Sequence, residues 1–332
     1  MRTPLVVLLG VAMAIGCRSA RFDPASKVET VRILATRADE PYAKPGDTVN
    51  LEMLAYDGRP TKPSPMNVYW IPVPCVDPPS DSYYRCYPGF ASLPAGVDIE
   101  SMLTAGTTFS FTMPGDVITK HTQRQGAVDA DPYGLTVIFS IACAGHVRYL
   151  PPVSGGGPNA LPLGCFDDNH VALGSDDYEF AFSLVYAFTD RTNANPVVDH
   201  LTADAAPIDV TQGLTLAHCA AAARDPNGNV NTSQCPATAL DVTMPDSSQE
   251  VDPANVDPSG KVLKESIRVQ YFLTDGALAN GTINLFDPAS ERIPNTTDDL
   301  TAPAAAGENV LWAVVRDNRG GTTWLAIPMH VN

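Results

Sequence analysis

The sequence VLWAVVRDNRGGTTWLAIPMHV, residues 310–331, decides the fold class. Two apolar runs flank Asp317-Asn-Arg-Gly-Gly321, whose Asp, Asn and Gly residues favour a tight turn. The second run places four apolar side chains on one face, with the period of a half-buried strand: Leu325, Ile327, Met329 and Val331. The stretch therefore predicts an antiparallel β-hairpin.

The same alternation recurs upstream, in Thr48–Ala55, Thr108–Met113, Glu179–Phe188 and Ile267–Tyr271. Amphipathic helix periods are nearly absent, and only Val97–Leu103 suggests a short helical turn. In Glu179–Phe188 the shared face is largely aromatic and carries Phe180, Phe182, Leu184, Tyr186 and Phe188. These patterns predict an all-β protein of antiparallel sheets with one solvated face.

The chain also repeats itself weakly. An offset of 167 residues relates three features of the two halves: Val31–Leu34 to Val198–Leu201, Gly46 to Gly213, and the expected strands Thr48–Ala55 to Thr215–Ala223. Each half closes with two strong strands, which in the first half are Leu135–Cys143 and Glu179–Phe188, separated by a long insertion. Between the halves, Thr189–Pro196 reads as a polar linker.

Several short strands per half, spaced by Pro, Gly, Asn and Asp turns, predict two tandem immunoglobulin-like β-sandwich domains. We expect the first at residues 28–190, with insertions, and the second at residues 191–332. The antibody signature is absent, because no cysteine pair has the long spacing that staples two sheets across a tryptophan. Trp70 is expected to be a core aromatic on a central strand.

The second half resembles the PKD-type and cadherin-type repeats of bacterial surface proteins. The matching residues are Ala223-Arg-Asp-Pro-Asn-Gly-Asn229 in an early turn and Val315-Arg-Asp-Asn-Arg-Gly-Gly-Thr322 at the last hairpin. The first half, with Ala43-Lys-Pro-Gly-Asp47 before its strand, resembles the sandwich domains of deltaproteobacterial lipoproteins. The resemblance implies a fold and a place in the cell envelope, and almost no chemistry.

The N-terminus reads as an export signal that ends at a cysteine. The apolar run Pro4–Ile15 is about 12 residues long, short of the roughly 20 that span a bilayer. Ala14 and Gly16 place small residues before Cys17, which resembles the lipobox of bacterial lipoproteins, although Ala14 replaces its usual leucine. The resemblance implies a signal peptide at residues 1–16, lipid on Cys17 and a tether at residues 17–27. The alternative is an ordinary secretory signal in which Cys17 has no role.

The cysteine count supports a lipidated Cys17, because seven is an odd number for an exported protein. The remaining six fall into three close pairs, separated by 11, 22 and 16 residues: Cys75 and Cys86, Cys143 and Cys165, Cys219 and Cys235. Six cysteines allow 15 connectivities, and we favour sequential pairing because short loops close at the lowest entropy cost. No CxxC spacing indicates a metal site, so we expect structural disulfides.

Charge excludes one class of partner. The chain has 37 acidic and 21 basic residues, a net charge of −16, and no visible basic stripe. Such a surface repels phosphate, so we expect no nucleic acid. The membrane is expected as a partner through the lipid on Cys17, and Arg18, which is not acidic, favours the outer membrane. The membrane face and the envelope protein or glycan that the protein meets are not readable.

Catalytic motifs are missing: the chain has no GxSxG, HExxH, GxxxxGK[ST] or GxGxxG. The histidines lack paired ligand spacing and comprise His121, His146, His170, His200, His218 and His330. His170 attracts attention because it follows Asp167-Asp-Asn169. The ordinary interpretation of such a segment is a solvated turn.

Calcium is the one cofactor that the sequence suggests. Asp225, Asn227 and Asn229 offer oxygen atoms at alternate positions, as in the first part of an EF-hand loop. The distal Glu is missing and only one of the three is a carboxylate, so this would be a weak site. The more acidic cluster Asp167, Asp168, Asp176 and Asp177 has no recognisable spacing. Our prediction is therefore no cofactor.

Exposed aromatic residues can mark a binding surface. Tyr83, Tyr84 and Tyr87 fall within or beside the loop that a Cys75–Cys86 bridge would close, and such loops on a rigid sandwich often carry recognition. They can grip a peptide, a glycan or a protein, or they can cover the edge of their own domain. We favour the second interpretation.

Together these features predict a non-enzymatic, lipid-anchored envelope protein that acts as a structural or protein-interaction and adhesion module. The alternative is a carbohydrate-binding accessory lipoprotein of the cell surface, in which Tyr83, Tyr84, Tyr87 or Trp70 form an exposed flat platform. A third hypothesis is an enzyme of unfamiliar type that uses Asp167–His170. It requires these side chains to converge at a cleft.

Overall fold

The computed structural model describes residues 24–90, 97–122, 131–150, 161–223, 230–289 and 291–332. Strands dominate these residues, and the helices are single turns: α2 (Tyr87–Phe90), α3 (Val117–Lys120) and the 3-10 turns η1 (Pro79–Asp81), η2 (Tyr83–Cys86), η3 (Glu100–Met102), η4 (Ala220–Ala222) and η5 (Asp246–Ser248). The expected helical turn in Val97–Leu103 is η3. Among the described helices, none is long and apolar enough to span a membrane. The all-β prediction is confirmed.

The first sandwich packs a three-stranded sheet against a larger one. The small sheet has the order β1-β3-β7, from β1 (Val31–Ala38), β3 (Thr48–Asp57) and β7 (Thr108–Thr112). The large sheet has the order β2-β11-β8-β4-β6, from β2 (Tyr42–Ala43), β11 (Tyr178–Ala187), β8 (Gly134–Cys143), β4 (Asn67–Trp70) and β6 (Thr104–Ala105), with β5 (Cys75–Val76) also on β8. Alternate side chains of the two sheets meet in a core that includes Val49, Leu51, Phe109, Trp70 and Ile138.

The second sandwich has the same plan. One sheet has the order β13-β12-β15-β22-β19, from β13 (Ala206–Pro207), β12 (His200–Ala203), β15 (Ala237–Thr243), β22 (Asp298–Thr301) and β19 (Ala277–Leu278). The other has the order β14-β24-β23-β18-β20-β21, from β14 (Leu214–Leu216), β24 (Thr322–Val331), β23 (Gly307–Asp317), β18 (Ile267–Leu273), β20 (Thr282–Asp287) and β21 (Glu291–Arg292). A separate hairpin, β16 (Val251–Val256) with β17 (Val262–Lys264), projects from it.

Both sandwiches have immunoglobulin-like strand order. In each, the last two long strands pair antiparallel, β8 with β11 and β23 with β24. In each, a short early strand lies parallel to the last one, β2 on β11 and β14 on β24. The hairpin predicted from residues 310–331 is therefore confirmed, and so is the prediction of two tandem sandwiches.

One predicted strand of the repeat is wrong. Residues 215–223 do not form a counterpart of β3: the strand there is only β14 (Leu214–Leu216), and η4 (Ala220–Ala222) follows. The central strand equivalent to β3 is β15, which begins at Ala237. The alanine-rich run lacks the β-branched side chains that favour strands, and the Cys219–Cys235 bridge closes it into a loop.

Gly46 and Gly213 do share a conformation. Their φ angles are +91° and +78°, in the region that side chains disfavour. At Gly213 a Cβ atom would also lie 2.2 Å from the Pro328 carbonyl oxygen.

The aromatic stripe of β11 does not face the core between the two sheets. Val185 and Ala187 point into that core, whereas Phe180, Phe182 and Tyr186 lie on the outer face of the large sheet. Two insertions cover this face, one between β4 and β6 and the other, with β9 (His146–Tyr149) and β10 (Leu163–Phe166), between β8 and β11. We call this covering layer the cap. It explains why every residue of β8 is buried.

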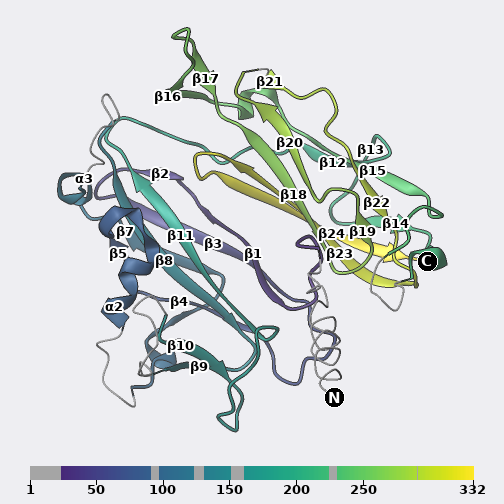
Figure 1. Ribbon diagram of the computed structural model, residues 1–332, viewed down its shortest axis with the longest axis horizontal. Helices are drawn as coiled ribbons and strands as arrows, with labels where there is room; N and C mark the ends of the chain where they lie inside the picture. Colours follow the sequence, from purple (N-terminus) through teal and green to yellow (C-terminus); the bar gives the residue numbers. More distant parts are fainter. Residues whose placement is uncertain (1–23, 91–96, 123–130, 151–160, 224–229, 290) are drawn as a thin grey trace, which may run out of the picture.

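The two sandwiches lie side by side, not end to end (Figure 1). The outer face of β1 and β3 packs on the outer face of β18 and β23, through Leu34 and Tyr56 on one side and Phe272, Trp312 and Val314 on the other. The rings of Tyr56 and Trp312 meet edge to face with centroids 4.7 Å apart. Burying large side chains of this kind contributes about 1.5–3 kcal/mol each. We call this contact the interdomain face.

The linker after β11 is fastened to both sandwiches. It forms no strand, as predicted, but its polar side chains bond on both sides. The Asn195 amide donates to the Ala38 carbonyl (2.7 Å), and its oxygen accepts from the Thr322 amide (2.8 Å). Asn193 donates to the Asp317 carboxylate (3.1 Å). These bonds fix the direction in which the second sandwich leaves the first.

Candidate interaction site

The lipidation site Cys17 lies outside the described residues, and its role stays a prediction. The described end of the predicted tether is held by the second sandwich. The Val28 amide donates to the Leu273 carbonyl (2.9 Å), and the Leu273 amide donates to the Ser26 carbonyl (2.8 Å). Lys27 also pairs with Asp275 (3.2 Å). The chain therefore contacts the second sandwich before it enters β1 of the first.

All three sequential disulfides are confirmed. Cys75–Cys86, Cys143–Cys165 and Cys219–Cys235 have Cα–Cα distances of 5.9, 5.8 and 5.8 Å. The first two hold the cap, since Cys75 and Cys143 belong to strands of the large sheet and Cys86 and Cys165 to the covering insertions. Each bridge is expected to contribute about 2–4 kcal/mol by restricting the unfolded chain.

The three candidate tyrosines belong to the cap. Tyr83 stacks on Phe182 of β11, with ring centroids 3.9 Å apart and planes inclined by 15°. Tyr87 packs on Phe139 of β8 at 5.7 Å. Burial raises the pKa of the Tyr87 hydroxyl. These rings cover the first domain's own sheet, in line with the interpretation that we favoured.

The aromatic residues form no flat platform. Tyr83 meets Tyr84 and Tyr87 edge to face, with interplanar angles of 81° and 70°. Trp70 is completely buried in the first core and donates its indole N–H to the Gly106 carbonyl (3.0 Å). The carbohydrate-binding alternative required such a platform, so the geometry of these four residues does not support it.

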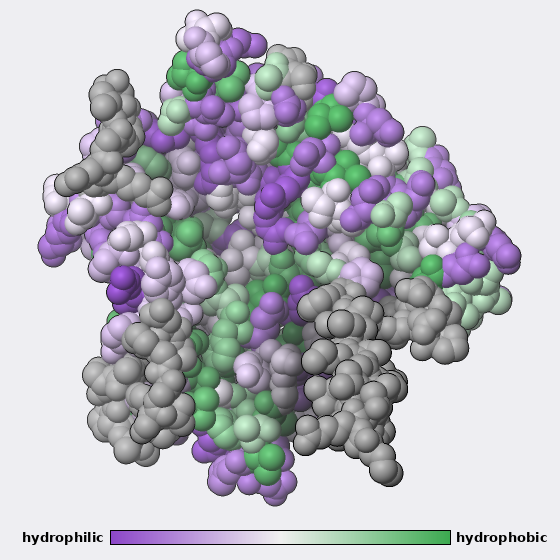
Figure 2. All heavy atoms as spheres, viewed as in Figure 1, coloured by the Kyte–Doolittle hydropathy of each residue, from purple (hydrophilic) through white to green (hydrophobic). Residues whose placement is uncertain are grey.

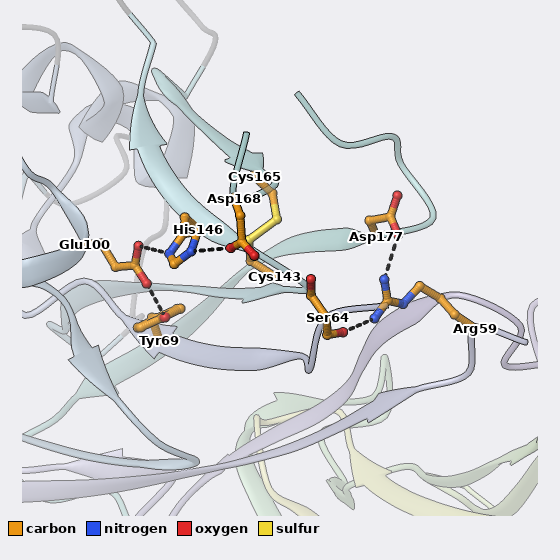
Figure 3. The surroundings of a disulfide bond; sticks show 9 residues. All are labelled: Arg59, Ser64, Tyr69, Glu100, Cys143, His146, Cys165, Asp168 and Asp177. Atoms are coloured by element: carbon orange, nitrogen blue, oxygen red, sulfur yellow. Dashed lines mark hydrogen bonds and ion pairs between the residues drawn. A yellow bond between two sulfur atoms is a disulfide. The ribbon is translucent and has the colours of Figure 1, made fainter. Parts of the chain in front are cut away.

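The acidic candidates serve local structure. Asp167 accepts the Asn169 and Val171 amides and so caps its own turn, and His170 lies exposed on that turn. Asp177 pairs with buried Arg59 (2.8 Å), which fastens the end of β3 to the start of β11 (Figure 3). The described residues include no group of three His, Cys, Asp or Glu side chains placed to hold a metal ion. Asp225, Asn227 and Asn229 lie outside the described residues.

A histidine that the sequence gave no reason to select lies between two carboxylates. His146 of β9 is 3.0 Å from Glu100 through Nδ1 and 3.0 Å from Asp168 through Nε2 (Figure 3). Tyr69 of β4 donates its hydroxyl to the other oxygen of Glu100 (2.6 Å). The bonds to Glu100 and Asp168 raise the pKa of His146 above its ordinary value. This cluster links the two insertions of the cap beside the Cys143–Cys165 bridge.

A buried arginine joins the two sandwiches at the linker. The Arg319 side chain, 4 % exposed, donates to Glu265 (2.9 Å) and also to Glu250 and Asn193. Its guanidinium lies 5.7 Å from the ring of Tyr42, on β2 of the first sandwich. Burial, together with repulsion from Asp317, raises the pKa of Glu265 to about 7. We call this group the Arg319 cluster.

A polar hollow of about 490 Å³ lies on the outer face of β1, β3 and β7, where the linker crosses it. Its lining comprises Arg37, Asp39, Asn50, Leu51, Glu52, Thr108, Phe109, Ser110 and Asn195. Two rows of bonds cross its floor. Arg37 pairs with Glu52 (2.6 Å), while Asn50 donates to Asp39 (2.5 Å) and accepts from Ser110 (2.7 Å). The guanidinium of Arg37 also lies 4.3 Å from the ring of Trp324, on the second sandwich.

A second exposed feature is the projecting β16–β17 hairpin, at the top of Figure 2, where hydrophobic residues gather. Val251, Val256 and Val262 are 55 %, 51 % and 44 % exposed. The Arg319 cluster lies at the base of this hairpin, since Glu250 and Glu265 flank the two strands. The hairpin is therefore held at its base.

Sequence reasoning missed the Arg319 cluster and the His146 cluster. The sequence suggested only a turn position for Arg319. The one signal available was its long cationic side chain within the Asp317–Gly321 turn, which can reach back to buried carboxylates. His146 comes shortly after the expected strand Leu135–Cys143. Its carboxylate partners Glu100 and Asp168 lie 46 positions before it and 22 positions after it in the sequence. Only the fold brings them together.

We expect Glu100→Gln to lower the pKa of His146 towards its ordinary value of 6.5. NMR titration of the His146 ring measures this, and Asp168→Asn is the matched variant with a smaller expected shift. Because the folded pKa lies above the unfolded one, stability from protonated His146 is complete below about pH 6.5 and lost as the pH rises through the folded pKa. An unchanged titration in Glu100→Gln would show that the carboxylate does not hold the proton.

Arg319→Met is expected to lower the free energy of unfolding by about 3–5 kcal/mol, because it leaves Glu265 buried and unpaired. Denaturant titration measures the loss. Arg268→Met, at an exposed arginine of β18, is the control and should change stability by less than about 0.5 kcal/mol. The double variant Arg319→Met/Glu265→Met should recover much of the loss. If Arg319→Met and Arg268→Met lowered the free energy of unfolding equally, the Arg319 cluster would not stabilise the fold as described.

No protein-family model and no curated protein matches the chain. Among solved structures, it is similar to the fibronectin(III)-like modules of CbhA from Clostridium thermocellum, with 11 % identity, TM-score 0.22, and 90 % of this chain and 94 % of that chain covered. It is also similar to three N-terminal domains of the outer capsid protein Hoc of bacteriophage RB49 (10 %, TM-score 0.18, 91 % and 59 %). A third similarity is to dimeric latent PorU from Porphyromonas gingivalis (10 %, TM-score 0.20, 92 % and 24 %). The fold assignment rests on the strand order of the two sandwiches themselves.

Proposed function

We propose that this chain is a non-enzymatic, lipid-anchored protein of the bacterial cell envelope that presents a fixed two-domain surface to a partner protein. The observation that carries the proposal is the interdomain face, which packs Leu34 and Tyr56 of one sandwich on Phe272 and Trp312 of the other. Domains that act only as spacers on a flexible linker need no such contact. Two domains that bind one partner together gain from it, because a fixed arrangement lowers the entropy cost of binding.

The position of the anchor supports the same proposal. Ten peptide steps separate Cys17 from Lys27, where the chain is held by the second sandwich, so the tether reaches at most about 35 Å. A lipid on Cys17 would therefore keep both sandwiches near the membrane. The net charge of −16 opposes adsorption to anionic headgroups, which leaves the protein surface free for a partner.

The chemistry of the polar clusters favours binding over catalysis. Both ring nitrogens of His146 bond to carboxylates, those of Glu100 and Asp168, and these bonds raise the pKa of the ring, so its two nitrogens are engaged in structural contacts. The carboxylates of the Arg319 cluster are committed to a buried guanidinium. These groups hold structural elements together.

Cys17→Ser is expected to abolish fatty-acid labelling and to move the protein from the membrane to the soluble fraction. Metabolic labelling with an alkyne fatty acid, followed by fractionation, measures both. Ser19→Ala is the matched control, because it changes a neighbouring side chain and leaves the cysteine in place. Unchanged labelling and membrane partitioning of Cys17→Ser would refute the lipid anchor.

A further inference from the structure

The small sheet of the first sandwich ends in an open edge. Strand β7 pairs with β3 on one side, with Thr108 opposite Glu52 and Thr112 opposite Thr48. No other described residue pairs with its second side. β7 therefore presents a sheet edge to whatever lies next to it.

The register shows which backbone groups face outward. The Met53 amide donates to the Thr107 carbonyl and the Met113 amide donates to the Asp47 carbonyl, both at 2.8 Å. Hydrogen-bonded pairs alternate along an antiparallel ladder, so the odd-numbered residues between them bond to β3. The N–H and C=O groups of Thr108, Ser110 and Thr112 consequently point away from β3. They form one row of backbone donors and acceptors that no described residue pairs with.

The second sandwich closes the equivalent edge. Its strand β22 corresponds to β7, and β19 pairs with it, with Ala277 opposite Thr301 and Leu278 opposite Leu300. The side chain of Asp298, at the start of β22, further accepts the Gly281 amide (2.7 Å). The two sandwiches share a topology, so the absence of a described strand beside β7 is a specific feature of the first.

β7 also lacks the devices that protect sheet edges. Natural edge strands carry lysine, proline or a bulge, which prevent pairing with another chain. The sequence of β7 is Thr-Phe-Ser-Phe-Thr, with regular register along β3. Phe109 and Phe111 are buried, and Thr108, Ser110 and Thr112 are exposed. The edge is a regular template for a further strand.

The polar hollow adjoins this edge, because Thr108 and Ser110 line it. A strand added to β7 would lie two strand spacings, about 9.6 Å, from β3. A long side chain on its outer face would reach Glu52 of β3, whose side chain is 43 % exposed. The hollow holds two carboxylates, Glu52 and Asp39, and one guanidinium, Arg37, which is paired with Glu52. Its lining therefore keeps one net negative charge, which together with the net charge of −16 favours a cation on the added strand.

We propose that β7 binds an extended peptide segment of a partner protein by strand addition, with a lysine or arginine of that segment directed into the hollow. The inference rests on the proposed function as an interaction module and names the partner's chemistry. Main-chain hydrogen bonds to Thr108, Ser110 and Thr112 supply affinity, and the charge in the hollow supplies selectivity.

The test measures fluorescence anisotropy of a labelled nine-residue peptide that alternates Val and Lys, with full-length protein in detergent. Ser110→Pro removes one outward N–H without touching the ladder to β3. Thr282→Pro is the matched control, because it removes an outward N–H at an exposed position of β20 in the second sandwich. We expect Ser110→Pro to weaken binding at least tenfold and Thr282→Pro to bind like the unmodified protein. Two results would overturn the proposal: equal binding by both variants, or no binding by the unmodified protein at up to about 1 mM peptide, a Kd that corresponds to about 4 kcal/mol of binding free energy.

The charge is tested separately. Glu52→Gln should weaken binding of the Val-Lys peptide by about threefold, in the range of an exposed ion pair. Glu40→Gln is the matched control, because it changes the net charge equally at an exposed position that does not line the hollow. A Val-Glu peptide should bind more weakly than the Val-Lys peptide. Equal losses in both variants would indicate general attraction to an acidic protein and would overturn the role of the hollow.

Hydrogen exchange supplies a readout that does not depend on a variant. Saturating Val-Lys peptide should slow exchange in the fragment that contains residues 108–112 at least tenfold, and leave the fragment with β22 unchanged. Protection elsewhere without protection of β7 would refute strand addition. Lipid labelling of Cys17 is measured in cells, so a labelled protein with no protection at β7 would remove this inference and leave the proposed anchor standing.

Discussion

The structure depends on one contact, the interdomain face. The first sandwich buries the outer side of its small sheet against the outer side of β18 and β23 of the second, where the rings of Trp312 and Tyr56 meet edge to face. Figure 1 shows β1 and β3 of the first sandwich beside β18 and β23 of the second. Two other features follow from it. The linker can bond to both sandwiches through Asn195, and Arg37 of the polar hollow can lie over the ring of Trp324 on the second sandwich.

A second constraint acts on the opposite side of the first sandwich. Strand β8 is buried on both faces, one against the core between the sheets and the other against the cap. Insertions have little secondary structure of their own, so the cap needs other means of attachment. Two disulfides, the stacking of Tyr83 on Phe182 and the His146 cluster supply them. Within the described residues, the small sheet has no such cover at β7, which makes that edge distinctive.

Patterns within single segments of the sequence predicted most long strands, the last hairpin and the disulfides, because contacts between residues close in sequence determine these features. Alternating side chains located most long strands, and the turn at Asp317–Gly321 located the last hairpin. Short spacing predicted all three disulfides. Thr215–Ala223 was wrong, because its alternation is weak and Cys219 binds it into a loop. Three features could not be predicted from any one segment: the side-by-side packing, the Arg319 cluster and the open edge of β7. Each depends on where the fold places residues that are tens to hundreds of positions apart in the sequence.

The most direct test of a fixed two-domain body is the distance between two spin labels, one on each sandwich. Cysteines introduced at Val73 and Val210, which are 68 % and 43 % exposed, carry the labels in a Cys17→Ser background. Pulsed electron resonance should give one narrow distance distribution, because the interdomain face and the linker bonds hold both sandwiches. A broad distribution in the folded protein would show that the sandwiches move independently, and would contradict the account.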